Sequence, residues 1–387
     1  MNARAARCGS QPGKQSGLAL VIVLGFLVMA AITTAVAYWK PRSGSGPWDG
    51  HTEEVLNQAR MALIGRAVGD DDRPGSLPCP DGNGDGIADL LVGNACASYV
   101  GRLPWRTLGL SNLRDASGEG LWYALSPSLR DDTSAEPINS DTSAQLSLNT
   151  PTPLMNIAAV VIAPGPALPW QSREAAAQNN IASYLEGGNA DGDDVYQTGA
   201  ISATFNDRLT IITREQLFNV VEWRVANELR ARLQRYFVTH GYFPYANAYS
   251  VGTFACTNNQ TRGRIPNPNP ITQISATCPA NSDWAGGGLT VPLPQWFFDN
   301  GWYLLTYYSL APACTSATPN CTGTGFLTVN TATDVRAVVI VGARAFGFQP
   351  RPCTVATECI EQPLAAADGY RKIPMSVSFN DKVSVIR

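Results

Sequence analysis

The sequence predicts an α+β protein with an N-terminal transmembrane helix followed by two tandem lobes, each a helix packed on a mostly antiparallel sheet. Three observations predict this. An uncharged apolar segment lies near the N-terminus, a series of short landmarks recurs after it, and every cysteine except Cys8 follows it. Of the 387 residues, 44% are hydrophobic and 15% are charged, so the chain can bury a core. The net charge of −3 gives no indication of a nucleic-acid-binding surface.

The apolar segment, Leu18–Trp39, contains no charged residue. As a helix it is long enough to cross a hydrocarbon layer of about 30 Å. Arg4, Arg7 and Lys14 precede it, which favours a cytoplasmic N-terminus and a periplasmic body. A plain single-pass anchor and a secretory signal peptide are the alternatives. The signal peptide fits less well, because the segment is long and ends in Tyr-Trp-Lys-Pro instead of small residues.

Two helices predict where the lobes begin. Residues 40–51 are rich in Pro, Gly and Ser and predict a linker. A helix that starts at Thr52 opens the first lobe, 52–212. A second helix, Thr213–His240, has a capping box and opens the second lobe, 213–387. We therefore expect that cutting the chain near Thr213 leaves two halves that fold separately.

The body repeats its landmarks in the same order, which indicates a duplicated domain. The pairs are GSLP with GYFP, GRLP with GRIP, GLWYALS with GWYLLTYYS, AAVVIA with RAVVIV, and FNDRLTIIT with FNDKVSVIR. In the last pair, Asp207 and Asp381 occupy equivalent positions. We predict turn or strand-start roles for these two residues.

The cysteines after the apolar segment form neighbouring pairs, which predicts disulfides in an oxidising compartment. Short loops close most easily, so we expect local pairing. The predicted bonds are Cys79–Cys96, Cys256–Cys278, Cys314–Cys321 and Cys353–Cys359. A zinc site is not favoured, because the sequence contains no Cys-x2-Cys motif.

The stretch DGNGDGIAD predicts a calcium loop as the one expected cofactor site. Asp81, Asn83, Asp85 and Asp89 supply alternating oxygen ligands, and Gly86 permits a sharp turn. The loop is not an EF-hand, since its twelfth position is Val92. The alternative is an Asx/Gly turn held by the Cys79–Cys96 disulfide.

No motif predicts an enzyme. The sequence contains no Gly-x-Ser-x-Gly, His-Glu-x-x-His or phosphate-loop pattern, and its two histidines, His51 and His240, lie apart. Several tryptophans, Trp105 among them, are candidates for a carbohydrate or peptide groove, although core packing explains them better.

Two sets of motifs carry a family resemblance. The stretch KQSG followed by LALVIVLGFLVMAA resembles the N-terminus of type IV prepilins and pseudopilins. That resemblance implies cleavage after Gly17 by a prepilin peptidase, with 1–17 as a cytoplasmic leader and 18–39 as membrane anchor and filament core. This family usually has Glu at the position that Ile22 occupies here, and some minor pseudopilins also lack this Glu. RPGSLPCPDGNGDGIAD, GRLPWRTLGL and GEGLWYALS resemble a poorly characterised pilin-like group of Gram-negative bacteria.

The resemblance implies a function without catalysis. The chain would be a membrane-anchored minor or tip subunit of a type IV pilus or a type II secretion-like filament. Its partners would be other pilins, through the N-terminal helix, the inner membrane and the prepilin peptidase, but no nucleic acid. It would be a single-pass inner-membrane protein with a periplasmic body, or would lie in a filament. The alternative is an anchored periplasmic binding protein or adhesin that never enters a filament.

Overall fold

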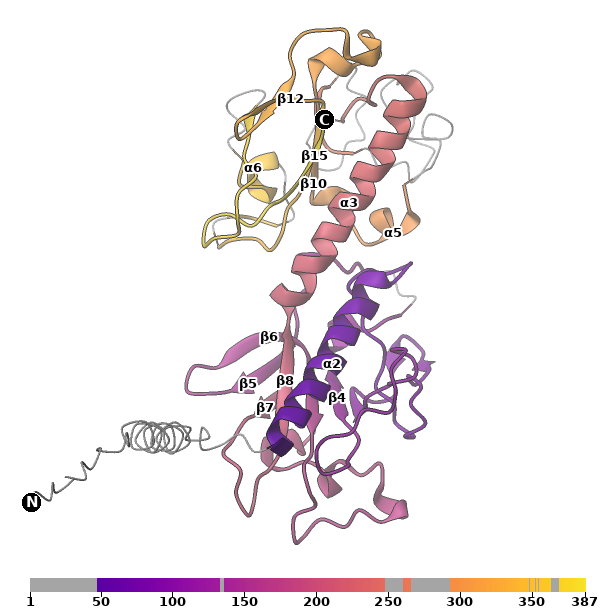
Figure 1. The fold of residues 1–387 in the computed structure, drawn as a ribbon, viewed down its shortest axis with the longest axis vertical. Coiled ribbons are helices and arrows are strands. Elements are labelled where there is room, and N and C mark those ends of the chain that lie inside the picture. The colour runs from indigo at the N-terminus through magenta and orange to yellow at the C-terminus, as the bar shows by residue number, and fades with distance from the viewer. Residues whose placement is uncertain are drawn as a thin grey trace, which may run out of the picture. The chain divides into compact units, whose positions relative to one another are not determined.

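The computed structural model describes residues 47–132, 136–247, 260–265, 293–347, 349–351, 353, 355–362 and 369–387. Contacts divide the chain into two units, Met1–His51 and Thr52–Arg387. The second unit holds both halves of the body (Figure 1). Its division into two lobes at Thr213 stays a prediction.

The predicted fold class is wrong in its N-terminal part. Among the residues that the structure describes, no helix is both long and apolar enough to cross a membrane. The predicted segment, Leu18–Trp39, lies outside these residues. Two long helices within the described ranges are α2 (Pro47–Gly69) and α3 (Arg214–His240), and both expose polar side chains along one side, as helices that cover a sheet do. The absence of a membrane-spanning helix among the described residues also corrects the predicted single-pass inner-membrane location. The predicted α+β class of the body agrees with the structure.

The first half builds a six-stranded sheet. Its order is β3-β4-β6-β5-β7, and β8 pairs with the free side of β6. All pairings are antiparallel except that of β5 with β7. The strands are β3 (Val100–Arg102), β4 (Trp122–Leu125), β5 (Leu146–Asn149), β6 (Leu154–Ala163), β7 (Val195–Gln197) and β8 (Arg208–Thr213). A separate two-stranded hairpin joins β1 (Leu91–Val92) and β2 (Ala95–Cys96).

The second half builds a four-stranded sheet, β15-β13-β10-β9, and a three-stranded sheet, β12-β11-β14. Its short helices are α5 (Gln295–Asp299) and α6 (Ala356–Cys359). The strands are β9 (Arg262–Gly263), β10 (Thr306–Leu310), β11 (Leu327–Val329), β12 (Ala332–Val335), β13 (Ala337–Val341), β14 (Gly369–Tyr370) and β15 (Lys382–Ile386).

The strand order of the two halves is the same. The order β8-β6-β4-β3 of the first sheet recurs as β15-β13-β10-β9 in the second. The arrangement of β5, antiparallel to β6 and parallel to β7, recurs in β11 with β12 and β14. Single hydrogen bonds recur too: the hydroxyl of Tyr123 donates to the Pro78 carbonyl at 3.2 Å, and that of Tyr308 donates to the Pro244 carbonyl at 3.0 Å.

Side chains alternate between the two faces of the first sheet along each strand, and both faces are buried. Tyr123 and Val161 belong to the same buried cluster as Leu63 of α2, which Figure 1 shows over this sheet. Trp122 and Ile162 lie on the opposite face, in a smaller cluster with Tyr196 of β7 and with Tyr184, which lies between β6 and β7 in the sequence. The same large cluster that contains Tyr123 continues into the second half.

Helix α3 connects the two sheets. Thr213 is the last residue of β8 and also the N-cap of α3, where it forms a capping box with Gln216. Gly241 ends the helix in the left-handed conformation, with φ of 78°. The buried side of α3 contacts β13 and β15 of the second sheet. Its buried apolar residues are Leu217, Phe218, Val221, Val225, Ala226, Leu229, Leu233 and Tyr236.

Polar contacts join the first half to the second, and we call them the seam. Asn139 donates its side-chain amide to the Asn300 carbonyl at 2.8 Å, and Asn300 accepts the Ile138 N–H at 3.1 Å. Both asparagines are buried. These bonds satisfy amide groups that would be costly to bury alone.

A buried ion pair completes the seam. Glu222 of α3 lies 3.3 Å from the Lys382 ammonium of β15, and their side chains are 3% and 2% exposed. Ser140, from the first half, donates its hydroxyl to the other oxygen of Glu222 at 2.9 Å. Burial raises the pKa of Glu222 to about 7, against the lowering effect of Lys382 and Ser140. The pair therefore depends on every one of its partners.

We expect Lys382→Met to lower the free energy of unfolding by about 3–5 kcal/mol, because it leaves a carboxylate buried without a cation. The loss should be smaller at pH 6 than at pH 9, since a neutral Glu222 needs no partner. Urea unfolding of the variant at both pH values measures this.

The matched control is the double variant Glu222→Gln with Lys382→Met, which should recover most of the lost stability. A single variant as stable as the parent protein at pH 9 would show that the pair contributes nothing.

Candidate functional site

The predicted calcium loop folds as a chain of Asx turns. Asp81 is 1% exposed, and its Oδ1 accepts the N–H groups of Asn83 at 3.2 Å and Gly84 at 2.6 Å. Its Oδ2 accepts the Gly86 N–H at 2.6 Å. Asn83 in turn accepts the N–H of Asp85 at 2.9 Å. Backbone donors therefore engage both oxygens of Asp81, as the alternative interpretation of a turn expects.

The Asp89 carboxylate lies beside this chain of turns: a Cβ atom at Gly82 would approach its Oδ2 to 2.5 Å. The Asp89 N–H donates to the Pro80 carbonyl at 3.3 Å. Within the described ranges, no group of three or more His, Cys, Asp or Glu side chains is placed to hold a metal ion. The calcium site at Asp81, Asn83, Asp85 and Asp89 stays a prediction.

Three of the four predicted disulfides are present. They join Cys79 to Cys96, Cys314 to Cys321 and Cys353 to Cys359. Cys256 and Cys278 lie outside the described residues. The first bond ties β2 to the segment that precedes Asp81, so it closes the base of the Asp-rich loop. These bonds are compatible with an oxidising compartment.

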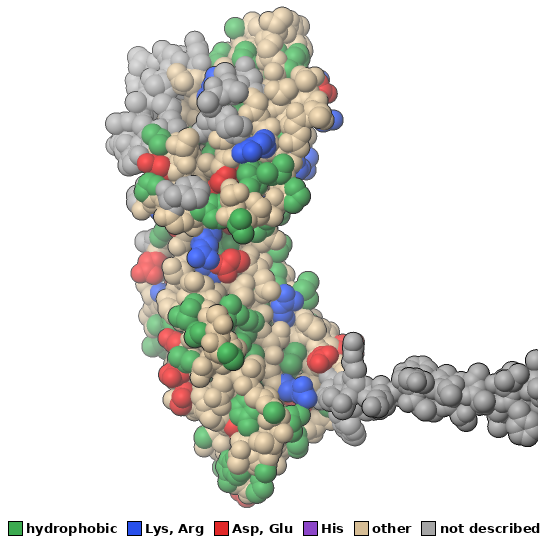
Figure 2. All heavy atoms as spheres, turned by 90° about the vertical axis from the view of Figure 1, so that its left-hand side faces the viewer, with side chains coloured by type: hydrophobic (Ala, Val, Ile, Leu, Met, Phe, Trp, Pro, Cys, Tyr) green, Lys and Arg blue, Asp and Glu red, His purple; other side chains and the backbone are tan. Residues whose placement is uncertain are grey.

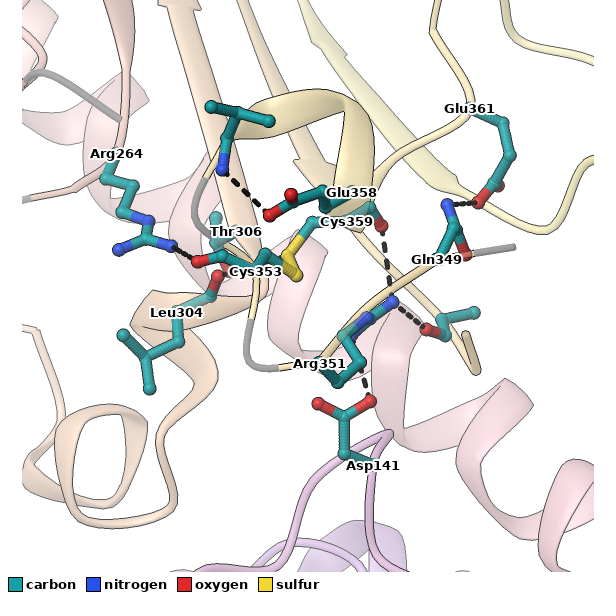
Figure 3. Close-up of a disulfide and its surroundings, with 12 residues drawn as sticks. Asp141, Arg264, Leu304, Thr306, Gln349, Arg351, Cys353, Glu358, Cys359 and Glu361 are labelled. Atoms are coloured by element: carbon teal, nitrogen blue, oxygen red, sulfur yellow. Dashed lines mark hydrogen bonds and ion pairs between the residues drawn. A yellow bond between two sulfur atoms is a disulfide. The ribbon is translucent and has the colours of Figure 1, made fainter. Parts of the chain in front are cut away.

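The third disulfide lies beside a contact between the halves (Figure 3). Arg351 donates to the backbone carbonyls of Ala343 at 3.0 Å and Cys359 at 3.4 Å. Its other terminal nitrogen pairs with Asp141 of the first half at 2.9 Å. Burial raises the pKa of Asp141, and Arg351 opposes that rise. The loop closed by Cys353 and Cys359 is therefore held to the first half by a guanidinium.

A pocket of about 240 Å³ lies beside the Asp81 loop. Arg102 of β3 forms one wall, stacked between the rings of Trp122 at 4.3 Å and Tyr184 at 4.0 Å from their centroids. Its guanidinium donates to the carbonyls of Gly120 at 3.1 Å and Gln178 at 2.6 Å. Burial lowers the pKa of Arg102. The other lining residues include Asp81, Gly84, Trp105, Asn112, Arg114, Glu119 and Asn179.

The chemistry of this pocket suits binding. The side chains that line it are carboxylates (Asp81 and Glu119), guanidinium groups (Arg102 and Arg114), amides, the rings of Trp105 and Tyr184, and leucines. Glu119 pairs with Arg173 at 3.2 Å, and the carboxylate of Asp81 is engaged by backbone. Amide groups and the partly exposed Trp105 ring remain to contact a ligand, and these bind neutral polar molecules.

A second pocket, of about 290 Å³, lies at the start of α3. Arg214, Phe218 and Glu222 line it from the helix, and Arg344 and Met375 line it from the second half. Figure 2 shows basic and acidic side chains dispersed over the face in view, separated by uncharged groups. Such a surface offers no continuous basic patch there for a nucleic acid.

Sequence analysis missed the most polar buried feature of each half. Asp207 and Asp381, for which we predicted turn or strand-start roles, each lie against a glutamate, Glu186 and Glu361. The repeated Phe-Asn-Asp letters marked the aspartates. The glutamates lie in loops whose sequences do not recur, so no pattern connected them with the aspartates.

Comparison with known proteins identifies no relative: no family model, no curated protein and no solved structure matches this chain.

We expect the double variant Cys79→Ser with Cys96→Ser to lose about 3 kcal/mol of stability, because the bond closes a loop of intermediate length in the unfolded chain. Urea unfolding without reductant measures the loss. The parent protein treated with reductant is no substitute, since it would open every disulfide. An unchanged midpoint would show that the Asp-rich loop is held by its turns alone.

The predicted calcium site has a direct test in calorimetric titration of the protein with calcium. We expect a binding heat that Asp85→Ala removes, because Asp85 is exposed and holds no turn except its own. Asp193→Ala, in the other acidic turn, is the matched control and should keep the heat. Absence of heat in the parent protein would exclude the site.

Proposed function

We propose that this chain is a non-enzymatic, pilin-like subunit that takes a minor or tip position in a type IV pilus or a type II secretion-like filament. The observation that supports this most is the repeated architecture. Each half is a helix that covers an antiparallel sheet of the same strand order, β8-β6-β4-β3 in one and β15-β13-β10-β9 in the other. The resemblance of the N-terminal sequence to prepilins points to the same class.

The size of the body supports a minor or tip position. Thr52–Arg387 forms one compact unit that contains both halves. A regular helical filament repeats one head at short intervals, and a head of double size suits the end of such an array better. The disulfides support exposure to an oxidising compartment.

The polar groups of the body support a role without catalysis. In the pocket beside Asp81 the two carboxylates are already engaged, Asp81 by backbone N–H groups and Glu119 by Arg173. Enzymes instead hold reactive groups at the surface of a pocket, with a partner that activates them.

The pocket beside Asp81 favours a second candidate function, a binding protein or adhesin that stays outside filaments. Arg102, held between two rings, gives this pocket a rigid wall. A neutral polar ligand such as a saccharide would stack on Trp105 and bond to the surrounding amides. This candidate and the filament subunit are distinguished by where the mature protein is found.

Mass spectrometry of the mature protein, purified from cells with a prepilin peptidase, tests the proposal. We expect a new N-terminus at Leu18, because the peptidase cuts after Gly17, and we expect the Gly17→Arg variant to keep Met1. Gly17 lies outside the described residues.

Co-purification with sheared filaments separates the two candidate functions. A filament subunit should appear in that fraction and disappear from it in the Gly17→Arg variant. An intact Met1 in the parent protein, with no copy in filaments, would contradict the proposal and leave the binding protein.

A further inference from the structure

Each closing strand begins beside a buried pair of acidic residues. Asp207 precedes β8 and Asp381 precedes β15, and they are 4% and 5% exposed. The Glu186 N–H donates to Asp207 Oδ2 at 2.9 Å and the Asp207 N–H donates to Glu186 Oε2 at 3.1 Å, and the Glu361 N–H donates to Asp381 Oδ2 at 2.9 Å, so each aspartate lies against its glutamate. Two negative charges in such a place would be costly, so the hydrogen bonds around them need a full account.

In the first half, N–H donors fill three of the four carboxyl oxygens. Asp207 Oδ2 accepts the Glu186 N–H at 2.9 Å and the Asn189 amide at 3.0 Å. Glu186 Oε2 accepts the N–H groups of Asn206 at 2.9 Å and Asp207 at 3.1 Å. Glu186 Oε1 accepts the Gln171 amide at 2.7 Å.

The second half contains a closely similar arrangement. Asp381 Oδ2 accepts the Glu361 N–H and the Gln362 amide, both at 2.9 Å. Glu361 Oε2 accepts the Asn380 N–H at 3.0 Å, and its Oε1 accepts the Gln349 amide at 2.8 Å (Figure 3). In both halves the glutamate N–H and a side-chain amide donate to the aspartate Oδ2, and a glutamine amide donates to the glutamate Oε1. The amide beside the aspartate comes from Asn189 in the first half and from Gln362 in the second.

One oxygen in each pair has no N–H donor. Asp207 Oδ1 and Asp381 Oδ1 are buried, and no hydrogen-bond donor in the described structure reaches them. A hydrogen bond between two carboxyl groups requires a proton on one of them, because ionised carboxylates only accept. A proton on Oδ1 would give this oxygen a hydrogen to donate toward the paired carboxyl group and would remove one of the two buried charges.

We propose that each half of the molecule binds one proton, held on the aspartate Oδ1 and shared with the paired glutamate, and that the two acid pairs are pH-dependent clasps between closing strand and loop. The first clasp consists of Gln171, Glu186, Asn189 and Asp207. The second consists of Gln349, Glu361, Gln362 and Asp381.

The basic groups around the first clasp are committed elsewhere. Arg173 donates to the carbonyls of Gly165 at 2.7 Å and Ser183 at 3.1 Å, and it pairs with Glu119. The charged group that acts on Asp207 is Glu186, which disfavours a second negative charge. We therefore assign the neutralisation of one of the two carboxylates, Asp207 or Glu186, to a bound proton.

The basic groups around the second clasp are committed in the same way. Arg351 pairs with Asp141, and Lys382, next to Asp381, pairs with Glu222. Arg371 donates to the backbone carbonyl of Glu361 at 3.3 Å, not to its carboxylate. Glu361 is the charged group that acts on Asp381.

The direction of the pKa agrees with this geometry. Burial raises the pKa of Asp207 to about 8, with Glu186 adding to the rise, and burial raises that of Asp381 well above its usual range. An unfolded aspartate has a pKa of about 3.9. Between these values the native protein holds a proton that the unfolded chain has lost, so stability falls as the pH rises through the range and levels off above the native pKa.

Urea unfolding of the full chain between pH 5 and pH 9 tests the clasps. In the parent protein, the unfolding equilibrium constant should rise with pH by up to about tenfold per pH unit for each clasp, until the pH passes the native pKa of that clasp. Asp207→Asn replaces Oδ1–H by an N–H donor of the same shape, so it should remove the dependence of one clasp. The double variant with Asp381→Asn should remove both.

Asp115→Asn is the matched control. Asp115 is equally buried, but both its oxygens accept N–H or hydroxyl donors, among them Ser117 at 2.9 Å and Gly165 at 2.9 Å. This variant should lose stability at every pH and keep the pH dependence of the parent protein. If Asp207→Asn behaves like Asp115→Asn, the proposal is overturned.

Infrared spectroscopy of the parent protein keeps the proposal testable should a variant fail to fold. We expect the carbonyl band of a buried protonated carboxylic acid at pH 7, which disappears at alkaline pH. A native protein without such a band at pH 7 holds no shared proton, and the proposal falls.

Discussion

The rest of the body depends on one short junction, the capping box at Thr213. This residue is the last of β8, the strand that completes the first sheet. Its hydroxyl accepts the Gln216 N–H and so caps the N-terminus of α3, the helix that covers the second sheet. No loop separates strand from helix, so a displacement of α3 pulls directly on the pairing of β8 with β6. The buried bonds of Asn139 with Asn300 and of Glu222 with Lys382 and Ser140 reinforce the junction from both sides. The seam therefore couples two halves that share one apolar core.

Within this frame the two halves keep the same polar chemistry as well as the same strands. Apolar cores tolerate exchange of one hydrocarbon side chain for another, whereas a buried carboxyl pair functions only with every donor in place. Gln171 and Gln349, which share few neighbours in sequence, still donate to equivalent glutamates. The two halves therefore share buried acid pairs at the start of their closing strands as well as the strand order.

Part of this structure was predictable from sequence, where local chemistry decides the outcome. The capping box of Thr213 with Gln216 and the helix to His240 follow from capping preferences and period, and short loops determine three cysteine pairs. The clasps were not predictable, because Glu186 and Glu361 reach their aspartates across about twenty residues without a repeated motif. The expected membrane helix is corrected by a different finding: no described helix is long and apolar enough to cross a membrane, and Leu18–Trp39, whose apolar length and flanking basic residues predicted the span, lies outside the described residues.

Native-state hydrogen exchange, followed by mass spectrometry in increasing urea, tests most directly whether the seam couples the halves. Amides of β6 and β13 lie at the centres of the two sheets, so both report the opening of their own half. Coupling predicts that the two strands exchange through a single unfolding event with the same free energy and the same dependence on urea. Exchange of one strand through an opening of clearly lower free energy, while the other strand stays protected, would contradict the account.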